Sequence, residues 1–190
     1  MSHKVLTQQG ILIRSSALTA LQAAQTLEAM RMSPGIPAAI NVKSEDAVDE
    51  RIRRSRSVDP PAGISATIDQ LLRELRPALE RHFDTPLSGH EPPHYLLYRS
   101  GDFFAAHRDR PSAPDSDLAT RRVSVVLFLN DDFDGGELRF YGLLEDERWE
   151  TIGFPCPAEA GMLVAFRSEL RHEVAPVRSG VRATIVTWFF

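Results

Sequence analysis

Two patterns of apolar residues divide the chain, with helical spacing before residue 93 and strand spacing after it. Helical spacing predicts one helix over 17–32 and a second over 65–83. Pro77 falls inside the second pattern, so we expect that helix to kink or split there. A short apolar run over 10–13 favours a strand ahead of the first helix.

The ends of the first helix and the region after it carry local signals. Ser15 and Ser16 are good N-caps, and Pro34-Gly35 should stop the helix. Residues 41–60 are charged and rich in arginine, which favours a loop or a short strand with flexible flanks. The arginines of this segment are Arg51, Arg53, Arg54 and Arg56.

From residue 94 the segments become short, β-branched and aromatic, and turn residues separate them. Eight such segments favour a jelly roll, or double-stranded β-helix (cupin-like), with the helices packed outside one sheet. The candidate strands are 94–99, 103–107, 121–129, 137–141, 148–152, 162–166, 171–177 and 182–189. We expect a mainly β fold with N-terminal helices (α+β). Residues 1–93 would support a jelly-roll core at 94–190 in one structural domain.

Composition limits the classes of partner. The net charge of −4 provides no overall positive field for nucleic acid or an anionic membrane, so neither is expected as a partner. The single cysteine, Cys156, excludes an intrachain disulfide framework, and its flanking prolines favour a loop position. Without a long apolar N-terminal stretch, a cytoplasmic location is the default expectation, and the oligomeric state is left open.

Three residues in the second half have the side chains of a metal site. His107 and Asp109 are two positions apart, so an extended backbone points both to one side, and His172 can come from a neighbouring strand. Two imidazoles and one carboxylate suit non-haem Fe(II) and leave positions open for reactants. The alternative is that His107 and Asp109 form a surface pair and that His172 is a histidine at a strand start whose hydrogen bonds are satisfied. The apolar segments around both histidines favour the metal site, because inward polar groups need partners.

A second metal pattern is rejected. His90-Glu91-Pro92-Pro93-His94 has the spacing of a zinc-protease motif, which requires a helix so that both histidines share a face. Two consecutive prolines oppose a regular helix, so the segment is interpreted as an extended lead-in to a strand.

Arg182 is a candidate anchor for an anion. In a strand over 182–189 it shares one face with Thr184 and Trp188. If that face lines the interior, the guanidinium needs an anionic partner, and a carboxylate matches its fork. The alternative is an arginine at a strand end that reaches solvent. The nearby metal ligands favour the anchor.

These residues resemble a known family. Tyr98 to Asp109 looks like the YxxGxxFxxHxD entry of 2-oxoglutarate/Fe(II)-dependent dioxygenases of the prolyl 4-hydroxylase type. The central strand of that family, with the turn after it, resembles residues 122–130 and Gly135-Gly136-Glu137-Leu138. Its closing half resembles residues 161–182. The match covers roughly 94–190, and the bacterial PKHD-type hydroxylases look most similar.

The resemblance implies roles for the site residues. His107, Asp109 and His172 would bind Fe(II), and Arg182 would hold the distal carboxylate of 2-oxoglutarate. Tyr98 would line the co-substrate pocket, and Thr184 and Trp188 could contact the co-substrate. O2 is the other co-substrate, and ascorbate is a possible accessory reductant.

The implied activity is hydroxylation of an unactivated C–H bond, with succinate and CO2 as co-products. A small molecule or amino-acid-like substrate is expected, and a peptidyl, prolyl-type target is the alternative. Some relatives have tyrosine where Phe104 and Phe128 stand, which leaves a prolyl substrate and the second partner of the distal carboxylate unassigned. Because Asp109 is retained, halogenation is disfavoured.

Other features bear on this function. The polar loop 110–117 is a candidate lid, and the arginines of 41–60 could grip an acidic substrate, although a solvated face is the simpler interpretation. The alternative from another class is a non-catalytic metal-binding jelly-roll binding protein. A zinc hydrolase would need a general base beside the metal, and the sequence offers no clear candidate.

Overall fold

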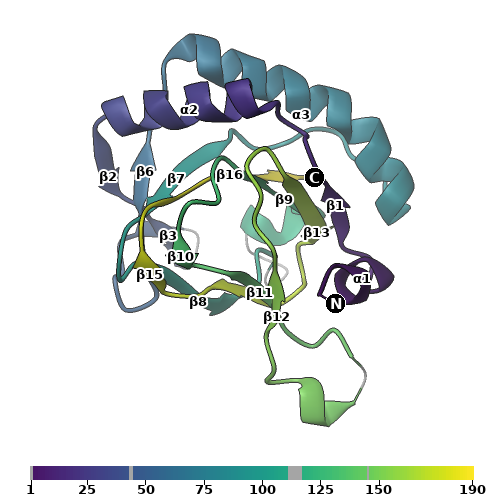
Figure 1. The fold of residues 1–190 in the computed structure, drawn as a ribbon. Coiled ribbons are helices and arrows are strands. Elements are labelled where there is room, and N and C mark those ends of the chain that lie inside the picture. The colour runs from purple at the N-terminus through teal and green to yellow at the C-terminus, as the bar shows by residue number, and fades with distance from the viewer. Residues whose placement is uncertain (1, 43–44, 111–116, 145) are drawn as a thin grey trace.

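The computed structural model describes residues 2–42, 45–110, 117–144 and 146–190. Its helices are α1 (Ser2–Gln8), α2 (Ala20–Met32) and α3 (Ala62–Phe83), with short 3-10 turns η1 (Asp117–Thr120) and η2 (Glu147–Trp149). Helices α2 and α3 lie together over the outer face of a sheet (Figure 1). No helix within these ranges combines the length and apolar character that crossing a bilayer requires.

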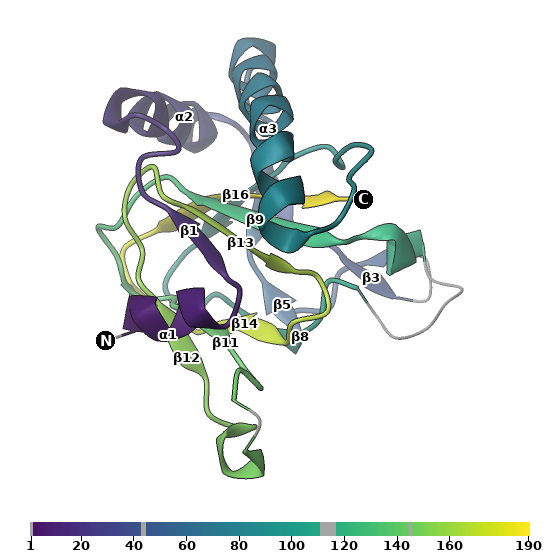
Figure 2. The same ribbon diagram turned by 90° about the vertical axis from the view of Figure 1, so that its right-hand side faces the viewer.

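Two antiparallel sheets enclose the interior, as Figures 1 and 2 show. The larger follows the order β1 (Leu12–Arg14), β13 (Leu163–Arg167), β9 (Val123–Phe128), β16 (Arg182–Phe189), β7 (His94–Tyr98), β6 (Arg56–Val58), β2 (Gly35–Pro37). The smaller follows the order β12 (Phe154–Cys156), β11 (Leu138–Phe140), β14 (His172–Val174), β8 (Phe103–His107), β5 (Arg53–Arg54). Two further pairs are β10 (Asp134–Gly135) with β15 (Val177–Ser179), and β3 (Ile40–Val42) with β4 (Glu45–Ala47). The predicted double-stranded β-helix with a helical buttress is confirmed.

Strand alternation in the larger sheet separates two cores. Val125 and Ile185 belong to a buried cluster that includes Leu72 of α3, so this face packs against the helices. Val126 belongs to another cluster, with Phe140 of the smaller sheet. The second face of the larger sheet therefore points into the space between the sheets.

The beginning of α2 differs from the prediction. Thr19, not Ser15 or Ser16, is the N-cap, and the helix begins at Ala20. The Thr19 side chain accepts from the Gln22 N–H at 3.2 Å, while the Gln22 side chain accepts from the Thr19 N–H at 2.9 Å. This reciprocal capping box satisfies two backbone donors, which a lone serine cap would not do.

Helix α3 continues through Pro77, so the split is wrong, and the kink that was its alternative stays a prediction. The buried stripe of Ile68, Leu72, Leu75 and Leu79 runs past the proline, which itself lies on the exposed face. At an exposed position, water can satisfy the carbonyl that loses its N–H partner. Tertiary packing of the apolar stripe therefore outweighs the local break.

Several strand predictions need correction. Residues 148–152 form no strand: η2 lies there and β12 begins only at Phe154, because Trp149 and Ile152 face solvent instead of a core. The expected strand at 171–177 divides into β14 and β15. The arginine-rich segment contributes β5 and β6, one to each sheet.

Candidate metal centre

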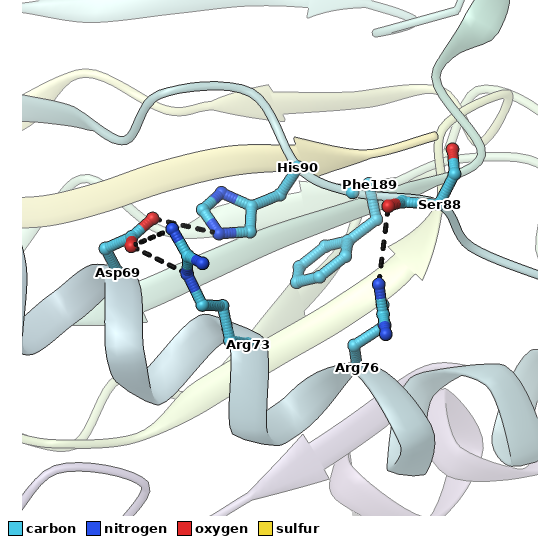
Figure 3. A pocket seen from close by; sticks show the side chains of 7 residues that line it. Asp69, Arg73, Arg76, Ser88, His90 and Phe189 are labelled. Atoms are coloured by element: carbon cyan, nitrogen blue, oxygen red, sulfur yellow. Dashed lines mark hydrogen bonds and ion pairs between the residues drawn. The ribbon is translucent and has the colours of Figure 1, made fainter.

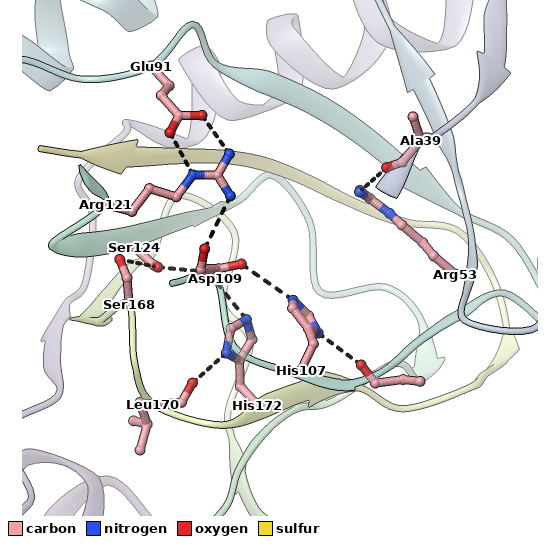
Figure 4. A network of polar contacts seen from close by, with 11 residues as sticks. Ala39, Arg53, Glu91, His107, Asp109, Arg121, Ser124, Ser168, Leu170 and His172 are labelled. Atoms are coloured by element: carbon pink, nitrogen blue, oxygen red, sulfur yellow. Dashed lines mark hydrogen bonds and ion pairs between the residues drawn. The ribbon is translucent and has the colours of Figure 1, made fainter. Parts of the chain in front are cut away.

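The three predicted metal ligands lie together at adjoining strand ends (Figure 4). His107 ends β8, His172 begins β14, and the two residues pair in the sheet register. Asp109 follows β8 directly and turns its carboxylate towards both rings, with Oδ1 3.4 Å from His107 Nε2 and Oδ2 3.4 Å from His172 Nε2. One ligand atom from each residue fits within a span of 4.8 Å, which a single ion can bridge.

Backbone carbonyls orient both imidazoles. His107 Nδ1 donates to the carbonyl of Ala105 and His172 Nδ1 to that of Leu170, each at 2.8 Å (Figure 4). Because a carbonyl only accepts, Nδ1 carries the proton in each ring. The lone pair of Nε2 is then directed towards Asp109 and any bound ion, as a metal-binding histidine requires.

The charge state of the cluster suits a divalent cation. Burial lowers the pKa of His172 to about 4, although Asp109 opposes this shift, so the ring is neutral at pH 7. Burial alone would raise the pKa of Asp109. In acid, where His172 is protonated, its charge lowers that pKa again. Together with His107 and the hydrogen bond from Ser124, it outweighs burial and holds the pKa of Asp109 well below its usual range. Two neutral nitrogens and one carboxylate are donors that fit Fe(II).

Two serines behind Asp109 were missed in the sequence. Ser124 Oγ donates to Asp109 Oδ2 at 2.7 Å and lies 2.9 Å from Ser168 Oγ, and both side chains are fully buried. A polar residue inside the apolar strand Val123–Phe128 was the available signal for Ser124. Ser168 gave no such signal, since it follows its strand.

Arg182 is buried in the interior without a carboxylate. It is 1% exposed, and among the described residues it makes no ion pair. Its Nη1 donates to Thr184 Oγ1 at 3.1 Å, and its Nε has no hydrogen-bond partner among the described residues. Its guanidinium lies 5.1 Å from the centre of the Tyr98 ring and 5.1 Å from that of the Phe128 ring. Burial lowers the pKa of Arg182 to about 10, so it is still charged at pH 7 and calls for an anion.

The metal ligands and Arg182 line one pocket between the sheets. Its walls are otherwise largely apolar, and they include Tyr98 and Trp188, while Thr184 reaches the site through Arg182. The lining residues are Arg53, Leu96, Tyr98, Phe104, His107, Asp109, Val126, Leu138, His172, Val174, Arg182, Val186 and Trp188.

Trp188 lies at the Asp109 end of the pocket. It pairs with Ser124 in the register of β16 and β9, whereas Arg182 pairs with Tyr98 of β7. The guanidinium of Arg121 stacks 3.5 Å from the centre of the indole. The indole Nε1 is buried and has no hydrogen-bond partner among the described residues.

Only one arginine of the 41–60 segment lines this pocket. Arg53 is 8% exposed and donates to the Ala39 carbonyl at 3.0 Å (Figure 4). Its guanidinium lies 4.7 Å from the centre of the Phe104 ring, which stacks on the His107 ring at 3.7 Å. Arg51 is exposed and pairs with Asp49. The candidate lid falls largely at 111–116, outside the described residues.

The two histidines of the rejected zinc motif do not belong to the metal-ligand cluster. His90 pairs with Asp69 at 3.2 Å in a groove beside α3, where Asp69 also binds Arg73 (Figure 3). Within the described residues, His107, Asp109 and His172 form the one cluster of three possible metal ligands.

Cys156 lies in β12 and not in the predicted loop, because its strand pairs with β11. Burial raises the pKa of its thiol to about 12, although Arg182 opposes this shift. The thiol is therefore protonated at pH 7, which agrees with its expected lack of nucleophilic character.

Comparison with known proteins places these residues in a family. The sequence pattern of the 2OG-Fe(II) oxygenase superfamily matches residues 93–190. A PKHD-type hydroxylase of Hyphomonas neptunium is 29% identical over 150 residues, which cover 75% of this chain and 62% of that protein. A PKHD-type hydroxylase of Synechococcus is 31% identical over 143 residues, which cover 72% of this chain and 59% of that protein. The chain thus spans about three fifths of these curated relatives.

Solved structures agree with this result. A Pseudomonas putida prolyl-4-hydroxylase has a TM-score of 0.73 and 30% identity, over 100% of this chain and 98% of that one. A viral collagen prolyl hydroxylase from Paramecium bursaria Chlorella virus-1 has the same fold, with a TM-score of 0.67 at 17% identity and 94% of each chain covered. The chain belongs to the 2OG-Fe(II) oxygenase superfamily, and PKHD-type hydroxylases are among its relatives.

Proposed function

We propose that this chain is an Fe(II)- and 2-oxoglutarate-dependent dioxygenase that hydroxylates an unactivated C–H bond of an amino-acid-like or other small substrate. One observation carries the proposal: one pocket contains both a cluster of three possible metal ligands and a buried arginine with no carboxylate partner among the described residues. The first feature calls for a divalent cation and the second for an anion, and an iron–2-oxoglutarate pair supplies both.

His107, Asp109 and His172 would hold Fe(II) on one side and leave positions for the reactants. Bound Fe(II) supplies O2 activation, which couples decarboxylation of 2-oxoglutarate to succinate and CO2 with transfer of one oxygen atom to the substrate. The protein contributes the fixed Nε2 lone pairs, the single carboxylate charge and an apolar wall that excludes water.

Arg182 would bind the distal carboxylate of 2-oxoglutarate. Its Nε has no hydrogen-bond partner within the described ranges, and Thr184 fixes the orientation of the guanidinium through Nη1. The rings of Tyr98 and Phe128 hold the guanidinium between them, so Phe128 offers packing where a tyrosine would offer a hydroxyl. Thr184 is therefore our candidate for the second polar group near that carboxylate.

Trp188 belongs in this proposal at the substrate end of the pocket. Its register partner is Ser124, whose hydroxyl binds Asp109, and it lies six positions after Arg182 along the extended strand β16. A co-substrate anchored on Arg182 would extend towards the metal. The indole, at the other end of the pocket, would then contact the substrate that is hydroxylated. The unpartnered Nε1 donor could bind an oxygen of that group.

A peptidyl, prolyl-type target is the second candidate substrate. The Pseudomonas putida prolyl-4-hydroxylase is similar to this chain over its whole length, which supports a proline-containing target. The phenylalanines at 104 and 128 depart from the tyrosines of some relatives and favour a different substrate.

A mass-spectrometric assay separates the two substrates. The Fe(II)-loaded protein would be incubated with 2-oxoglutarate, O2 and either free amino acids or proline-containing peptides, with Asp109→Ala as the inactive control. A gain of one oxygen atom on a free amino acid supports the first proposal, and the same gain on a peptide only would replace it with the second. If neither pool gains oxygen while 2-oxoglutarate is consumed, both substrate classes are wrong.

A further inference from the structure

Two fully buried hydroxyls form a short chain behind the candidate metal centre. Ser124 lies on β9 and Ser168 just after β13, and both side chains are 0% exposed (Figure 4). Ser124 Oγ is 2.7 Å from Asp109 Oδ2 and 2.9 Å from Ser168 Oγ. The chain thus runs from one serine through the other to a single oxygen of the carboxylate.

The ionised carboxylate fixes the direction of these hydrogen bonds. A carboxylate can only accept, so Ser124 must use its one proton on Asp109 Oδ2. Ser168 must then donate to Ser124, which accepts with a lone pair. A donor that itself accepts a hydrogen bond is polarised and strengthened, so Ser168 reinforces the contact that Ser124 makes.

The hydrogen bond distinguishes two oxygens that are otherwise equivalent. Asp109 Oδ1 and Oδ2 each lie 3.4 Å from one histidine Nε2, so distance to the imidazoles favours neither as the metal ligand. Only Oδ2 accepts from Ser124, which leaves Oδ1 with both lone pairs uncommitted to that hydroxyl.

We infer that Ser124, supported by Ser168, is a positioning residue that holds Asp109 as a ligand through Oδ1 alone. The inference rests on the proposed function and adds residues to it that touch neither the metal nor the reactants. A carboxylate that binds through one oxygen keeps the further coordination positions open. A neutral hydroxyl can orient the carboxylate without competing with the metal for its negative charge. An arginine or lysine at this position would compete for that charge.

Backbone hydrogen bonds around Ser168 hold the two hydroxyls in place. Arg110 N donates to the Ser168 carbonyl at 2.9 Å, and Ser168 N donates to the Arg122 carbonyl at 3.0 Å. Ser168 is therefore tied to the residue after Asp109 and to the segment that leads into β9. The hydroxyl pair and the ligand it orients are held by the same short stretch of backbone.

Binding of Co(II) to the full chain without O2 tests the inference, with affinity and the visible absorption spectrum as readouts. The variants are Ser124→Ala, Ser168→Ala and Ser124→Thr. The control is Thr26→Val in α2. Thr26 is 3% exposed, and its hydroxyl donates to the Gln22 carbonyl at 2.8 Å, so this substitution also removes a buried hydroxyl. Circular dichroism checks that each variant is folded.

We expect Ser124→Ala to weaken Co(II) binding about tenfold or more and to change the spectrum, as loss of a residue that orients a ligand does. Ser168→Ala should change both readouts in the same direction but less, Ser124→Thr should restore them, and Thr26→Val should leave them as in the wild type.

A folded Ser124→Ala protein with wild-type affinity and spectrum would overturn the inference. If that variant does not fold, an unchanged Ser168→Ala overturns it instead. A wild-type chain that binds no Co(II) contradicts the proposed metal site itself, which is a different result.

Discussion

At the scale of single residues, Arg182 is the side chain that most needs a ligand. A guanidinium that is 1% exposed has lost its hydration, and a threonine hydroxyl and two aromatic rings replace only part of it. A bound carboxylate would complete its hydrogen bonds. Burial of the charge destabilises the protein without ligand. Because only an anion offsets that loss of hydration, the same burial makes the site specific for an anion.

Replacing Arg182 should remove 2-oxoglutarate binding before it removes the fold. For Arg182→Gln we expect the Kd for 2-oxoglutarate, measured with Mn(II) and without O2, to rise roughly thirtyfold or more, since losing a buried charged partner costs about 2 kcal/mol or more. Arg148→Gln is the matched control, because Arg148 is exposed and pairs with Asp146 on the surface. Equal Kd values for the two variants would contradict the role of Arg182.

The buried ligands also predict an acid-sensitive fold in the metal-free protein. The pKa of His172 falls from 6.5 to about 4 on folding, first because the ring is buried. Between these values the unfolded chain binds more protons, so the free energy of unfolding falls as the pH falls from 6.5 towards 4. The lowered pKa of Asp109 adds a further loss below its unfolded value of 3.8.

Urea unfolding of the metal-free protein at pH 7 and pH 5 measures this effect. We expect the wild type to lose more stability between the two than His172→Gln, which has no imidazole to protonate at that position. A wild type that is equally stable at both pH values, or more stable at pH 5, would count against a buried neutral His172.

Residue type and spacing were enough to predict which four side chains meet in one pocket but not what surrounds them, and their role as ligands stays a prediction. His107, Asp109, His172 and Arg182 stand at positions that strand alternation sends to one side, and the structure brings them into one pocket. The contact between Ser124 and Ser168 joins two strands far apart in the chain, so no local pattern contained it.

At the scale of elements, periodicity predicted α2 and α3 and where they end, but it placed their first residues three positions away and did not predict α1. The stripe in α3 was visible because four buried residues repeat at helical spacing, and that same stripe carries the helix through Pro77. The start of α2 depended on a reciprocal contact between Thr19 and Gln22, which outweighs the N-cap preference of an isolated serine. The strand predicted at 148–152 failed because its apolar residues face solvent.

The capping box gives a prediction at this scale. Thr19→Ala should lower the free energy of unfolding by about 1 kcal/mol, because the Gln22 N–H loses its acceptor. Ser15→Ala is the control and should have little effect, since the helix does not begin there. Chemical denaturation of both variants decides between the two caps, and a larger loss for Ser15→Ala would contradict the structure.

At the scale of the whole molecule, the segments before and after residue 93 build the same sheets. Strands β1, β2 and β6 belong to the larger sheet, and β5 pairs with β8, which carries His107. Helices α2 and α3 cover the outer face of the larger sheet (Figure 2). The apolar run over 10–13 predicted a strand near β1, and a short strand was one of two alternatives for 41–60. The sequence pattern carried no signal for β2, and it did not show that these short strands join the sheets of the core.

A fragment of residues 94–190 should therefore not fold alone. It would expose the apolar face that packs on the helices and would leave β8 without its neighbour β5. We expect it to be aggregated or unfolded by circular dichroism, whereas the full chain shows a cooperative transition. A soluble fragment with a cooperative transition would show that residues 94–190 form an independent unit.

The measurement that tests the account most directly is O2-dependent formation of succinate from 2-oxoglutarate by the Fe(II)-loaded chain. We expect succinate from the wild type and from Arg148→Gln, no turnover from His107→Ala, and turnover from Arg182→Ala only at much higher 2-oxoglutarate. A wild type that neither forms succinate nor binds 2-oxoglutarate would contradict the account, as would variants at His107 and Arg182 that are as active as the wild type.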